Sequence, residues 1–304
     1  MSTESTKDMA ICLVVFNPAK TKRILMNYFY ARSLHEGAGL PVFTIELVYE
    51  GRSPEIPDAI HVHAKSFMFH KENLYRVLVE KVPKHFKKIA FLDSDIYFKE
   101  TSWYDKTSIL LNTHAIVQPY EFAFWLDLTY TKKLFRKKTI LLLPTNEWSF
   151  SYHPGFAWCM QREWYEQNGF FDYAVTGGGD TLSSAVWLKK DLPSHVRFIP
   201  PALNSIYNDY KSRFVDLKIT FLKGMEIFHL FHGSLINRQY IERHKILNLE
   251  TDIQNLTYKN EEGIFEWKDP KQWNSLFLTY FQQRNDDDLG LEEKQKEKEK
   301  EINP

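Results

Sequence analysis

The 304-residue sequence has little cysteine, no long apolar run and no excess of either charge. Its two cysteines, Cys12 and Cys159, each stand inside an apolar segment, so we expect buried free thiols and a reducing compartment rather than a disulfide framework. The polar first residues show no secretory signal pattern, and no apolar run approaches the roughly 20 residues that span a bilayer. We therefore expect a cytoplasmic protein without a stable membrane anchor.

The charge balance and the composition exclude two further classes. Lysine plus arginine and aspartate plus glutamate number 39 each, so no overall field is expected to attract nucleic acid. With 43% hydrophobic and 15% aromatic residues, the chain can bury a sizeable core, which excludes disorder for most of its length. We expect a flexible N-terminus over residues 1–9, one domain over 10–284, and a charged tail over 285–304 that is disordered or a frayed helix.

Apolar runs alternate with helical patterns in the first hundred residues. This alternation predicts an α/β fold with a mixed, mainly parallel sheet flanked by helices. Residues 200–232 look instead like irregular chain with short strands. The expected strands cover 11–16, 41–49, 59–63 and 89–92, and the expected helices cover 20–34 and 71–81.

A pair of aspartates, Asp93 and Asp95, directly follows the apolar strand 89–92. Ligands of open α/β sheets bind beyond the carboxyl ends of the strands. Two carboxylates separated by one residue offer hard oxygen ligands for Mg²⁺ or Mn²⁺, and such an ion can offset the charge of a departing nucleotide diphosphate. By themselves, the two residues could equally be strand-end aspartates in a turn.

Residues 71–98, with the sequence KENLYRVLVEKVPKHFKKIAFLDSDIYF, resemble the helix, strand and Asp-x-Asp motif of the metal-dependent GT-A glycosyltransferases. Similar enzymes without a membrane anchor occur in bacteria and in large DNA viruses. The resemblance implies that Asp93 contacts ribose or metal, that Asp95 coordinates the ion, and that Lys71 lies near the donor. It also implies a Rossmann-like GT-A catalytic domain over 10–284.

The two halves of that domain are expected to bind different substrates, the nucleotide sugar over 10–100 and the acceptor over 101–284. The segment VVFNP resembles the first strand and loop around the nucleotide base. This makes Phe16, Asn17 and Arg23 candidate donor contacts, although a solvated helix charge is the commoner explanation for Arg23.

The turn Gly177-Gly178-Gly179-Asp180 resembles the acceptor region of GT-A enzymes. Consecutive glycines let the backbone approach a ligand, so we expect Gly177 and Gly178 to contact the donor. In inverting members a carboxylate here removes the proton of the acceptor hydroxyl, which makes Asp180 the candidate base. Asp180 could instead cap a helix.

Two observations leave the inverting mechanism open. The commonest form of the family carries Glu-Asp at the turn, and here Gly179 stands at the Glu position. Glu121, Asp127 and Glu147 are alternative bases in the preceding stretch.

Two histidines, His229 and His232, lie in an apolar segment before Gly233. By position, His232 resembles the C-terminal histidine that completes the metal shell in many GT-A enzymes, and its nitrogen favours Mn²⁺ over Mg²⁺. His229 could be its neighbour or a packed core residue. The cations that follow, Arg238, Arg243, His244 and Lys245, could bind a diphosphate or form a solvated face.

The resemblance therefore implies a hexosyltransferase that moves a sugar from a nucleotide-diphosphate sugar to a hydroxyl of a glycan or other acceptor. A UDP-sugar is favoured by family frequency, and Mn²⁺ or Mg²⁺ would be held by Asp93, Asp95 and His232. Two alternatives stay open. One is a haloacid-dehalogenase-like phosphatase with Asp93 as nucleophile, and the other is a non-catalytic sugar-binding or scaffold protein of the same fold.

Overall fold

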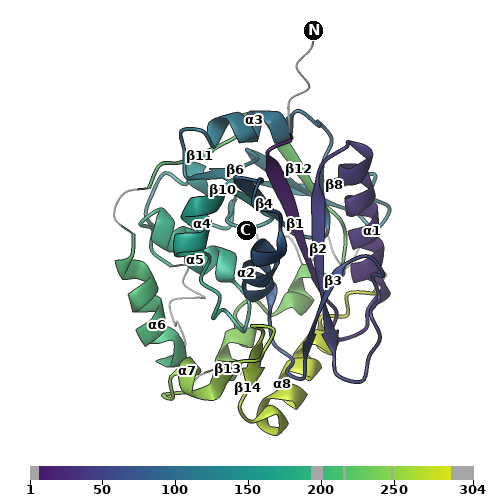
Figure 1. The fold of residues 1–304 in the computed structure, drawn as a ribbon, viewed down its shortest axis with the longest axis vertical. Helices are drawn as coiled ribbons and strands as arrows, with labels where there is room; N and C mark the ends of the chain where they lie inside the picture. Colours follow the sequence, from purple (N-terminus) through teal and green to yellow (C-terminus); the bar gives the residue numbers. More distant parts are fainter. Residues whose placement is uncertain (1–6, 193–200, 215–216, 248, 289–304) are drawn as a thin grey trace.

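The computed structural model describes residues 7–192, 201–214, 217–247 and 249–288. A seven-stranded sheet in the order β11-β6-β10-β4-β1-β2-β3 forms its centre (Figure 1). Neighbours pair in parallel except β10, which runs antiparallel between β4 and β6. The expected mixed, mainly parallel α/β sheet is confirmed. The strands are β1 (Met9–Phe16), β2 (Val42–Tyr49), β3 (Ile60–Ala64), β4 (Lys88–Leu92), β6 (Ile116–Gln118), β10 (Ala157–Gln161) and β11 (Ile219–Phe221).

Strand β1 lies in the interior and divides two hydrophobic cores. Because successive side chains of a strand point to opposite faces, Ala10, Cys12 and Val14 enter one core, and Met9 and the other alternate residues enter the second. Helix α2 (Lys71–Lys81) packs into the first core, and α1 (Lys22–Gly37) covers the second. Cys12 and Cys159 are buried free thiols, as expected.

A second, five-stranded sheet has the order β5-β12-β7-β8-β9, and a small ribbon pairs β13 with β14. Its strands and the ribbon are β5 (Ile96–Phe98), β7 (Phe122–Leu126), β8 (Lys133–Thr139), β9 (Tyr152–His153), β12 (Glu226–His229), β13 (Thr257–Lys259) and β14 (Phe265–Trp267). The remaining helices are α3 (Trp103–Leu110), α4 (Arg162–Asn168), α5 (Gly179–Trp187), α6 (Pro201–Ser212), α7 (Ile253–Leu256) and α8 (Pro270–Gln283), with 3₁₀ turns at Ile140–Leu142, Leu235–Arg238 and Glu242–Leu247.

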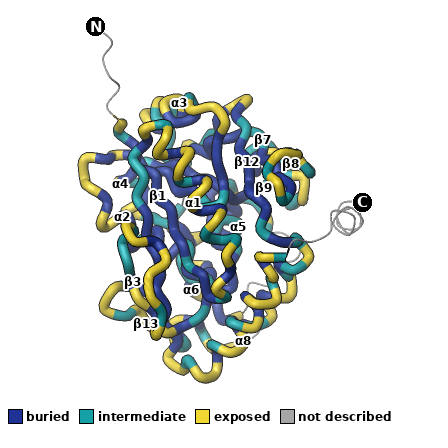
Figure 2. The backbone as a smooth tube through the Cα atoms, turned by 90° about the vertical axis from the view of Figure 1, so that its right-hand side faces the viewer, coloured by how far each residue is buried: buried dark blue, intermediate teal, exposed yellow. Residues whose placement is uncertain are grey.

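Helices α6, α7 and α8 lie with β14 at one end of the molecule, and α5 packs with them around a third core (Figure 1). The expectation of irregular chain over 200–232 is wrong for α6, which begins at Pro201 and buries Leu203, Ile206, Tyr207 and Tyr210 against that core. Their spacing of three and four residues gives an apolar stripe on one helix face. In Figure 2 the strands in the interior are buried and the outward sides of the helices are exposed.

Both ends of the described chain pack against the body more closely than expected. Asp8 forms an ion pair of 2.6 Å with Lys88, and Met9 is fully buried at the start of β1. At the other end Asp286 is only 2% exposed, and Asp287 accepts hydrogen bonds from two backbone N–H groups of α1. Residues 1–6 and 289–304, the rest of the expected flexible start and charged tail, lie outside the described residues.

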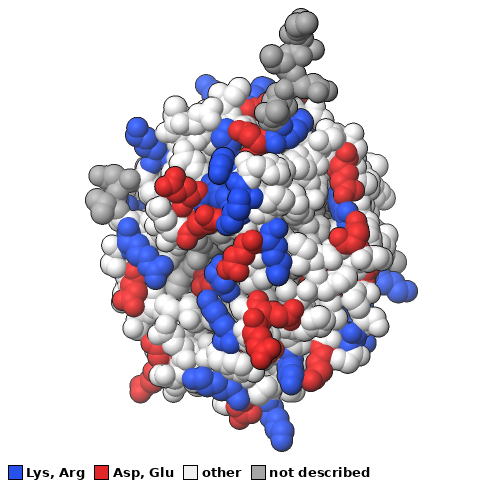
Figure 3. Space-filling model, in the orientation of Figure 1, with Lys and Arg blue, Asp and Glu red and all other residues white. Residues whose placement is uncertain are grey.

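The surface carries no single-sign field on the face drawn in Figure 3, where cationic and anionic side chains alternate. This agrees with the equal numbers of the two charges in the sequence. None of the helices in the described ranges is long and apolar enough to cross a bilayer.

Candidate active site

A cavity of about 370 Å³ opens where β4 ends and the chain passes into β5 of the second sheet. Segments far apart in the sequence line it: the end of β1, the start of α2, the Asp-x-Asp pair, the β8–β9 region, the glycine turn before α5, and the chain around His229 to Asp286. Its position beyond the carboxyl end of β4 is the one that open α/β sheets use for ligands.

Three candidate metal ligands, Asp95, His229 and His232, converge at one side of this cavity. The Nε2 atoms of the two histidines are 2.7 Å apart. The Oδ2 atom of Asp95 lies 3.0 Å from Nε2 of His232 and 3.5 Å from Nε2 of His229. Two imidazole nitrogens and a carboxylate oxygen suit a borderline divalent ion such as Mn²⁺ or Zn²⁺.

Strand register explains why the three residues meet. His229 is the last residue of β12 and pairs with Ile96 of β5, which directly follows Asp95. The backbone N–H of Leu230 also donates to the carbonyl oxygen of Asp95 at 2.8 Å. His232 follows three residues later, and its carbonyl oxygen accepts from Arg238 at 2.8 Å.

The hydrogen bonding of this cluster is incomplete, and two of its nitrogen atoms face each other. Within the described chain, Oδ1 of Asp95 and the Nδ1 atoms of both histidines are buried without a hydrogen-bond partner. Two Nε2 atoms in contact can share only one proton, whereas a metal ion would accept both lone pairs. Burial by itself would raise the pKa of Asp95, but the nearby His229 and Arg238 outweigh burial and lower it. The carboxylate of Asp95 therefore stays ionised. The donor set therefore fits a divalent ion.

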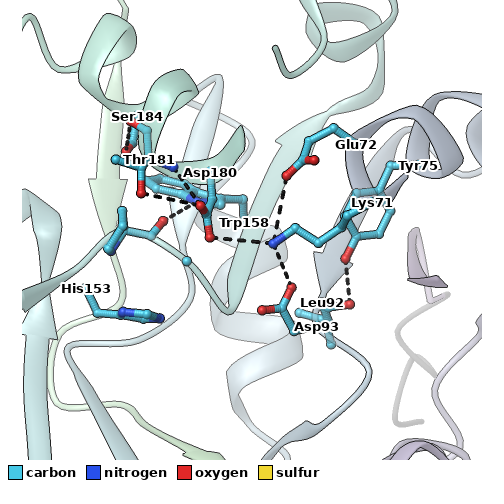
Figure 4. A network of polar contacts seen from close by, with 12 residues as sticks. Lys71, Glu72, Tyr75, Leu92, Asp93, His153, Trp158, Asp180, Thr181 and Ser184 are labelled. Carbon is cyan, nitrogen blue, oxygen red and sulfur yellow. Dashed lines mark hydrogen bonds and ion pairs between the residues drawn. The ribbon is translucent and has the colours of Figure 1, made fainter. Parts of the chain in front are cut away.

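Asp93 does not join this cluster. Its Oδ1 accepts from Nζ of Lys71 at 3.1 Å (Figure 4). Its backbone N–H donates to the carbonyl oxygen of Phe156. Burial raises the pKa of Asp93 to about 6, although Lys71 opposes the change. Of the predicted trio Asp93, Asp95 and His232, the structure groups Asp95 and His232 with His229, whereas Asp93 lies apart beside Lys71. The pairing of β5 with β12 explains this grouping, because it brings Asp95 beside His229.

Lys71 lies among three carboxylates and connects the two sides of the cavity (Figure 4). Besides Asp93, its Nζ atom is 3.5 Å from Oδ2 of Asp180 and 3.9 Å from Oε1 of Glu72. A cation at the first turn of a helix faces the positive end of the helix dipole, so its position depends on these carboxylates.

Asp180 lies in the first turn of α5, beside Lys71, and lines the cavity. It does not cap the helix: Gly178 is the N-cap residue, and Oδ1 of Asp180 accepts from the adjacent N–H of Thr181 at 2.7 Å. Burial alone would raise the pKa of Asp180, but Lys71, His153 and the Thr181 N–H outweigh it, so the pKa lies below its ordinary value. The carboxylate is ionised and faces the cavity, as a base requires.

Glu72, which with Lys71 matches the helix start near the donor site of related sequences, also lines the cavity. A Cβ atom at Gly179 would lie 2.8 Å from Cγ and 2.5 Å from Oε1 of Glu72, so the carboxyl occupies the space of a side chain at 179. Burial is the main reason that the pKa of Glu72 rises to about 7. The Gly179 position that departs from the family pattern therefore lies against a carboxyl supplied by α2.

The glycine turn makes room for an arginine. Gly177 and Gly178 have φ angles of 85° and 82°, which favour glycine, and a Cβ atom at 177 would lie 3.1 Å from Cζ of Arg243. Arg243 is 9% exposed and packs over the rings of Phe69 and Tyr240. Arg243 forms no ion pair within the described residues, and its buried Nε lacks a hydrogen-bond partner.

Two more arginines line the same side of the cavity. Arg238 and Arg284 share the buried Asp286, at 3.0 Å and 3.3 Å. With Arg243 they give three guanidinium groups to one carboxylate, an excess of positive charge suited to a diphosphate.

The other predicted residues divide clearly. Phe16, Lys71, Gly177 and Gly178 line the cavity. Asn17 instead organises its own loop by bonding Thr21, and Arg23 turns to the hydroxyl of Tyr130, so neither is among the described lining residues. The same is true of the alternative bases Glu121, Asp127 and Glu147.

No model of a known protein family matches the sequence, and neither does any curated protein. Among solved structures, the catalytic domain of Drosophila β1,4-galactosyltransferase 7 in complex with xylobiose is similar over 85% of this chain and 92% of that chain, with 12% identity and a TM-score of 0.39. GalNAc-T7 with UDP, GalNAc and Mn²⁺ is similar over 75% of this chain and 44% of that chain, with 8% identity and a TM-score of 0.42. A putative nucleotide-diphospho-sugar transferase from Desulfovibrio desulfuricans is similar over 71% of this chain and 80% of that chain, with 9% identity and a TM-score of 0.33. Scores this low do not establish function, which has to come from the geometry of the cavity.

Proposed function

We propose that this protein is a metal-dependent glycosyltransferase that moves a sugar from a nucleotide-diphosphate sugar to an acceptor hydroxyl. The proposal depends on one observation above all: Asp95, His229 and His232 bring three metal-ligand atoms together in a cavity that is also lined by the ionised Asp180 and by three arginines. Each of these parts has a distinct task in glycosyl transfer.

Asp95, His229 and His232 would hold the ion, and mixed nitrogen and oxygen ligands favour Mn²⁺ over Mg²⁺. When bound, the ion would offset the charge that develops on the departing diphosphate. Asp93, which accepts from Lys71 at 3.1 Å and lines the cavity, would contact the ribose of the donor.

The donor diphosphate would bind between the ligand cluster and Arg243, whose guanidinium has no carboxylate partner in the described chain. Arg238 and Arg284 add further donors from the same side. The small Gly177 and Gly178 leave the backbone accessible to the donor, and Phe16 supplies an apolar wall for the nucleoside. A UDP-sugar is the donor that the family resemblance favours.

Asp180 would accept the proton of the acceptor hydroxyl as it attacks the anomeric carbon, and this role corresponds to an inverting reaction. The attacking hydroxyl and the departing diphosphate must lie on opposite faces of the anomeric carbon in such a reaction. Lys71 orients Asp180 through its contact of 3.5 Å and keeps the carboxylate ionised.

Isothermal titration with UDP and GDP, in Mn²⁺ and in EDTA, tests the proposal. Binding of one nucleotide is expected in Mn²⁺ only, and it should weaken by at least roughly 100-fold in Asp95→Ala and His229→Ala, because even groups that merely support a metal ligand are worth 10- to 100-fold. His85→Ala, an exposed histidine outside the cavity, is the matched control.

Two results would contradict the proposal. Equal nucleotide binding in Mn²⁺ and in EDTA would show that the metal ion has no role in binding the donor. Release of phosphate from a phosphomonoester would favour the phosphatase. Nucleotide-sugar binding without turnover on any acceptor would leave a sugar-binding or scaffold protein.

A further inference from the structure

A lysine of β8, Lys137, lines the cavity away from the arginines. Its neighbour in sequence, Lys138, is exposed, as the alternation of side chains along a strand requires. The ammonium group of Lys137 lies 5.5 Å from the centre of the Trp125 ring and 5.7 Å from that of Phe150. Lys137 therefore presents a cation within an aromatic wall.

This cation has no anionic partner in the described part of the chain. Lys133, on the same strand, pairs with Glu226 at 2.9 Å, whereas no described carboxylate lies within ion-pair distance of Lys137. Burial lowers the pKa of Lys137 to about 8. A partly desolvated ammonium without a counter-charge is costly, and an anionic ligand would remove that cost.

The position of Lys137 assigns that anion to the acceptor rather than to the donor. The ring of Trp125, which Lys137 covers, packs edge-on against His153 at 4.9 Å. His153 and Asp180 both lie against the Cα of Gly155, where an added Cβ would contact each of them. The lysine is thus next to the residues around the proposed base.

The metal-ligand cluster borders this aromatic wall, because the rings of Trp125 and His229 have centres 5.8 Å apart. Phe156 stacks on His229 with ring centres 4.6 Å apart and is 4.8 Å from Trp125. The three arginines come from the C-terminal third of the chain. Arg243 packs with Phe69 and Tyr240, and Arg284 packs with Phe69 and Phe281, whereas Arg238 donates to the carbonyl oxygen of His232. Lys137 comes from β8 and shares none of the described ring contacts of these arginines.

Aromatic side chains near Lys137 can hold a sugar ring. Trp148, Phe150 and Tyr152 line the cavity beside it, and Phe150 is 47% exposed. Apolar ring faces next to one cation suit a sugar that carries a single anionic substituent. We propose that Lys137 and these aromatic residues form an acceptor subsite for an anionic sugar, one bearing a carboxylate, phosphate or sulfate group; this assignment rests on the proposed transferase function.

The test compares matched probes on the full chain. Methyl β-glucuronide, glucose 6-phosphate and glucose 6-sulfate are titrated against methyl β-glucoside by ligand-observed NMR, with and without UDP and Mn²⁺. The wild-type protein is expected to bind at least one anionic probe roughly 10-fold or more tightly than the glucoside, the value of one charged hydrogen bond. The probe bound most tightly identifies the anionic group.

Three variants locate the effect. Lys137→Met is expected to lose the preference and to bind the glucoside as before, whereas Lys137→Arg keeps the charge and should retain it. Lys138→Met, on the exposed side of the same strand, is the matched control and should behave as wild type. Thermal melts of all three check the fold.

The inference is overturned if the wild-type protein shows no preference for any anionic probe, or if Lys137→Met retains the preference. Failure of UDP to bind in Mn²⁺ is a separate result that contradicts the transferase proposal. If the anion preference and its loss in Lys137→Met persist in that case, the binding site stands and only its role as an acceptor subsite is overturned.

Discussion

The Nζ atom of Lys71 lies 3.5 Å from Oδ2 of Asp180, so one ion pair joins the first turns of α2 and α5 across the cavity. The same ammonium group also holds Asp93 at 3.1 Å. One ammonium group therefore offsets the charge of both aspartates.

Replacing Lys71 with Met is expected to destabilise the protein by about 3 kcal/mol at pH 8, because it leaves buried carboxylates without a partner. The pKa of Asp180 is lower in the folded protein than in the unfolded chain. This carboxylate therefore stabilises the fold at pH values above its unfolded pKa, and the stabilisation is lost as the pH falls through its folded pKa. Asp93, with a pKa of about 6, is largely protonated at pH 5. Thermal unfolding should thus show a smaller loss at pH 5 than at pH 8.

Lys71→Arg retains the charge and serves as the control, with a smaller loss expected. An equal loss at pH 5 and pH 8 would mean that packing, rather than charge, explains the effect.

Glu72→Gln should have the opposite effect on stability. The pKa of Glu72 is raised from its ordinary value of 4.5 to about 7, so the folded protein binds more protons than the unfolded chain between these values and loses stability as pH rises through that window. The gap corresponds to about 3 kcal/mol. The stability of Glu72→Gln relative to wild type should therefore increase from pH 5 to pH 8 in chemical denaturation. A constant difference would contradict the raised pKa.

Gly179→Ala tests the contact between α5 and Glu72. The new Cβ would lie 2.8 Å from Cγ of Glu72, and such overpacking costs about 1–3 kcal/mol. Combining it with Glu72→Ala should recover most of that loss, because the second change empties the space. If the two losses simply add in a double-mutant cycle, the residues do not compete for one place.

Asp180→Asn is expected to lower kcat for transfer by roughly 10²- to 10⁴-fold, the usual contribution of a positioned base. Metal-dependent UDP affinity should change little, because the residue lies outside the ligand cluster. Activity assays with a UDP-sugar and titration of UDP measure the two quantities on one preparation. Near-normal kcat would exclude Asp180 as the base.

Asp287→Ala should destabilise the protein by about 1 kcal/mol, the usual value of a helix N-cap. Helix α1 has no cap from its own Thr21 side chain, and Asp287 accepts from the backbone N–H groups of Lys22 and Arg23 at 3.0 Å and 2.7 Å. Denaturant unfolding measures the loss. No change would show that the contact is too exposed to contribute.

Most ends of the strands and helices predicted in the first hundred residues lie within two residues of the ends in the structure. They could be predicted because apolar runs and helical spacing are local signals. Helix α6 was missed because its apolar residues face a core made by α7, α8 and β14, which lie far along the chain.

The site was predictable in part. Asp93, Asp95, Asp180 and His232 all line the cavity, as the motifs indicated. His229 was left open, and the signal that could have favoured it is its position at the end of a strand beside His232. Glu72 was indicated only by its place beside Lys71 in the motif, and Lys137 gave no signal, because a charged residue in a strand is usually solvated.

The sequence alone determined the α/β class, the place of the aspartate pair at a strand end, and the glycine turn before Asp180, since each depends on neighbouring residues. Only the tertiary structure decided which side chains come together in the cavity. The register of β5 against β12 brings Asp95 to His229 and leaves Asp93 with Lys71, and β8 carries Lys137 to the cavity. Such contacts depend on strand pairing and packing between distant segments, and no local pattern encodes them.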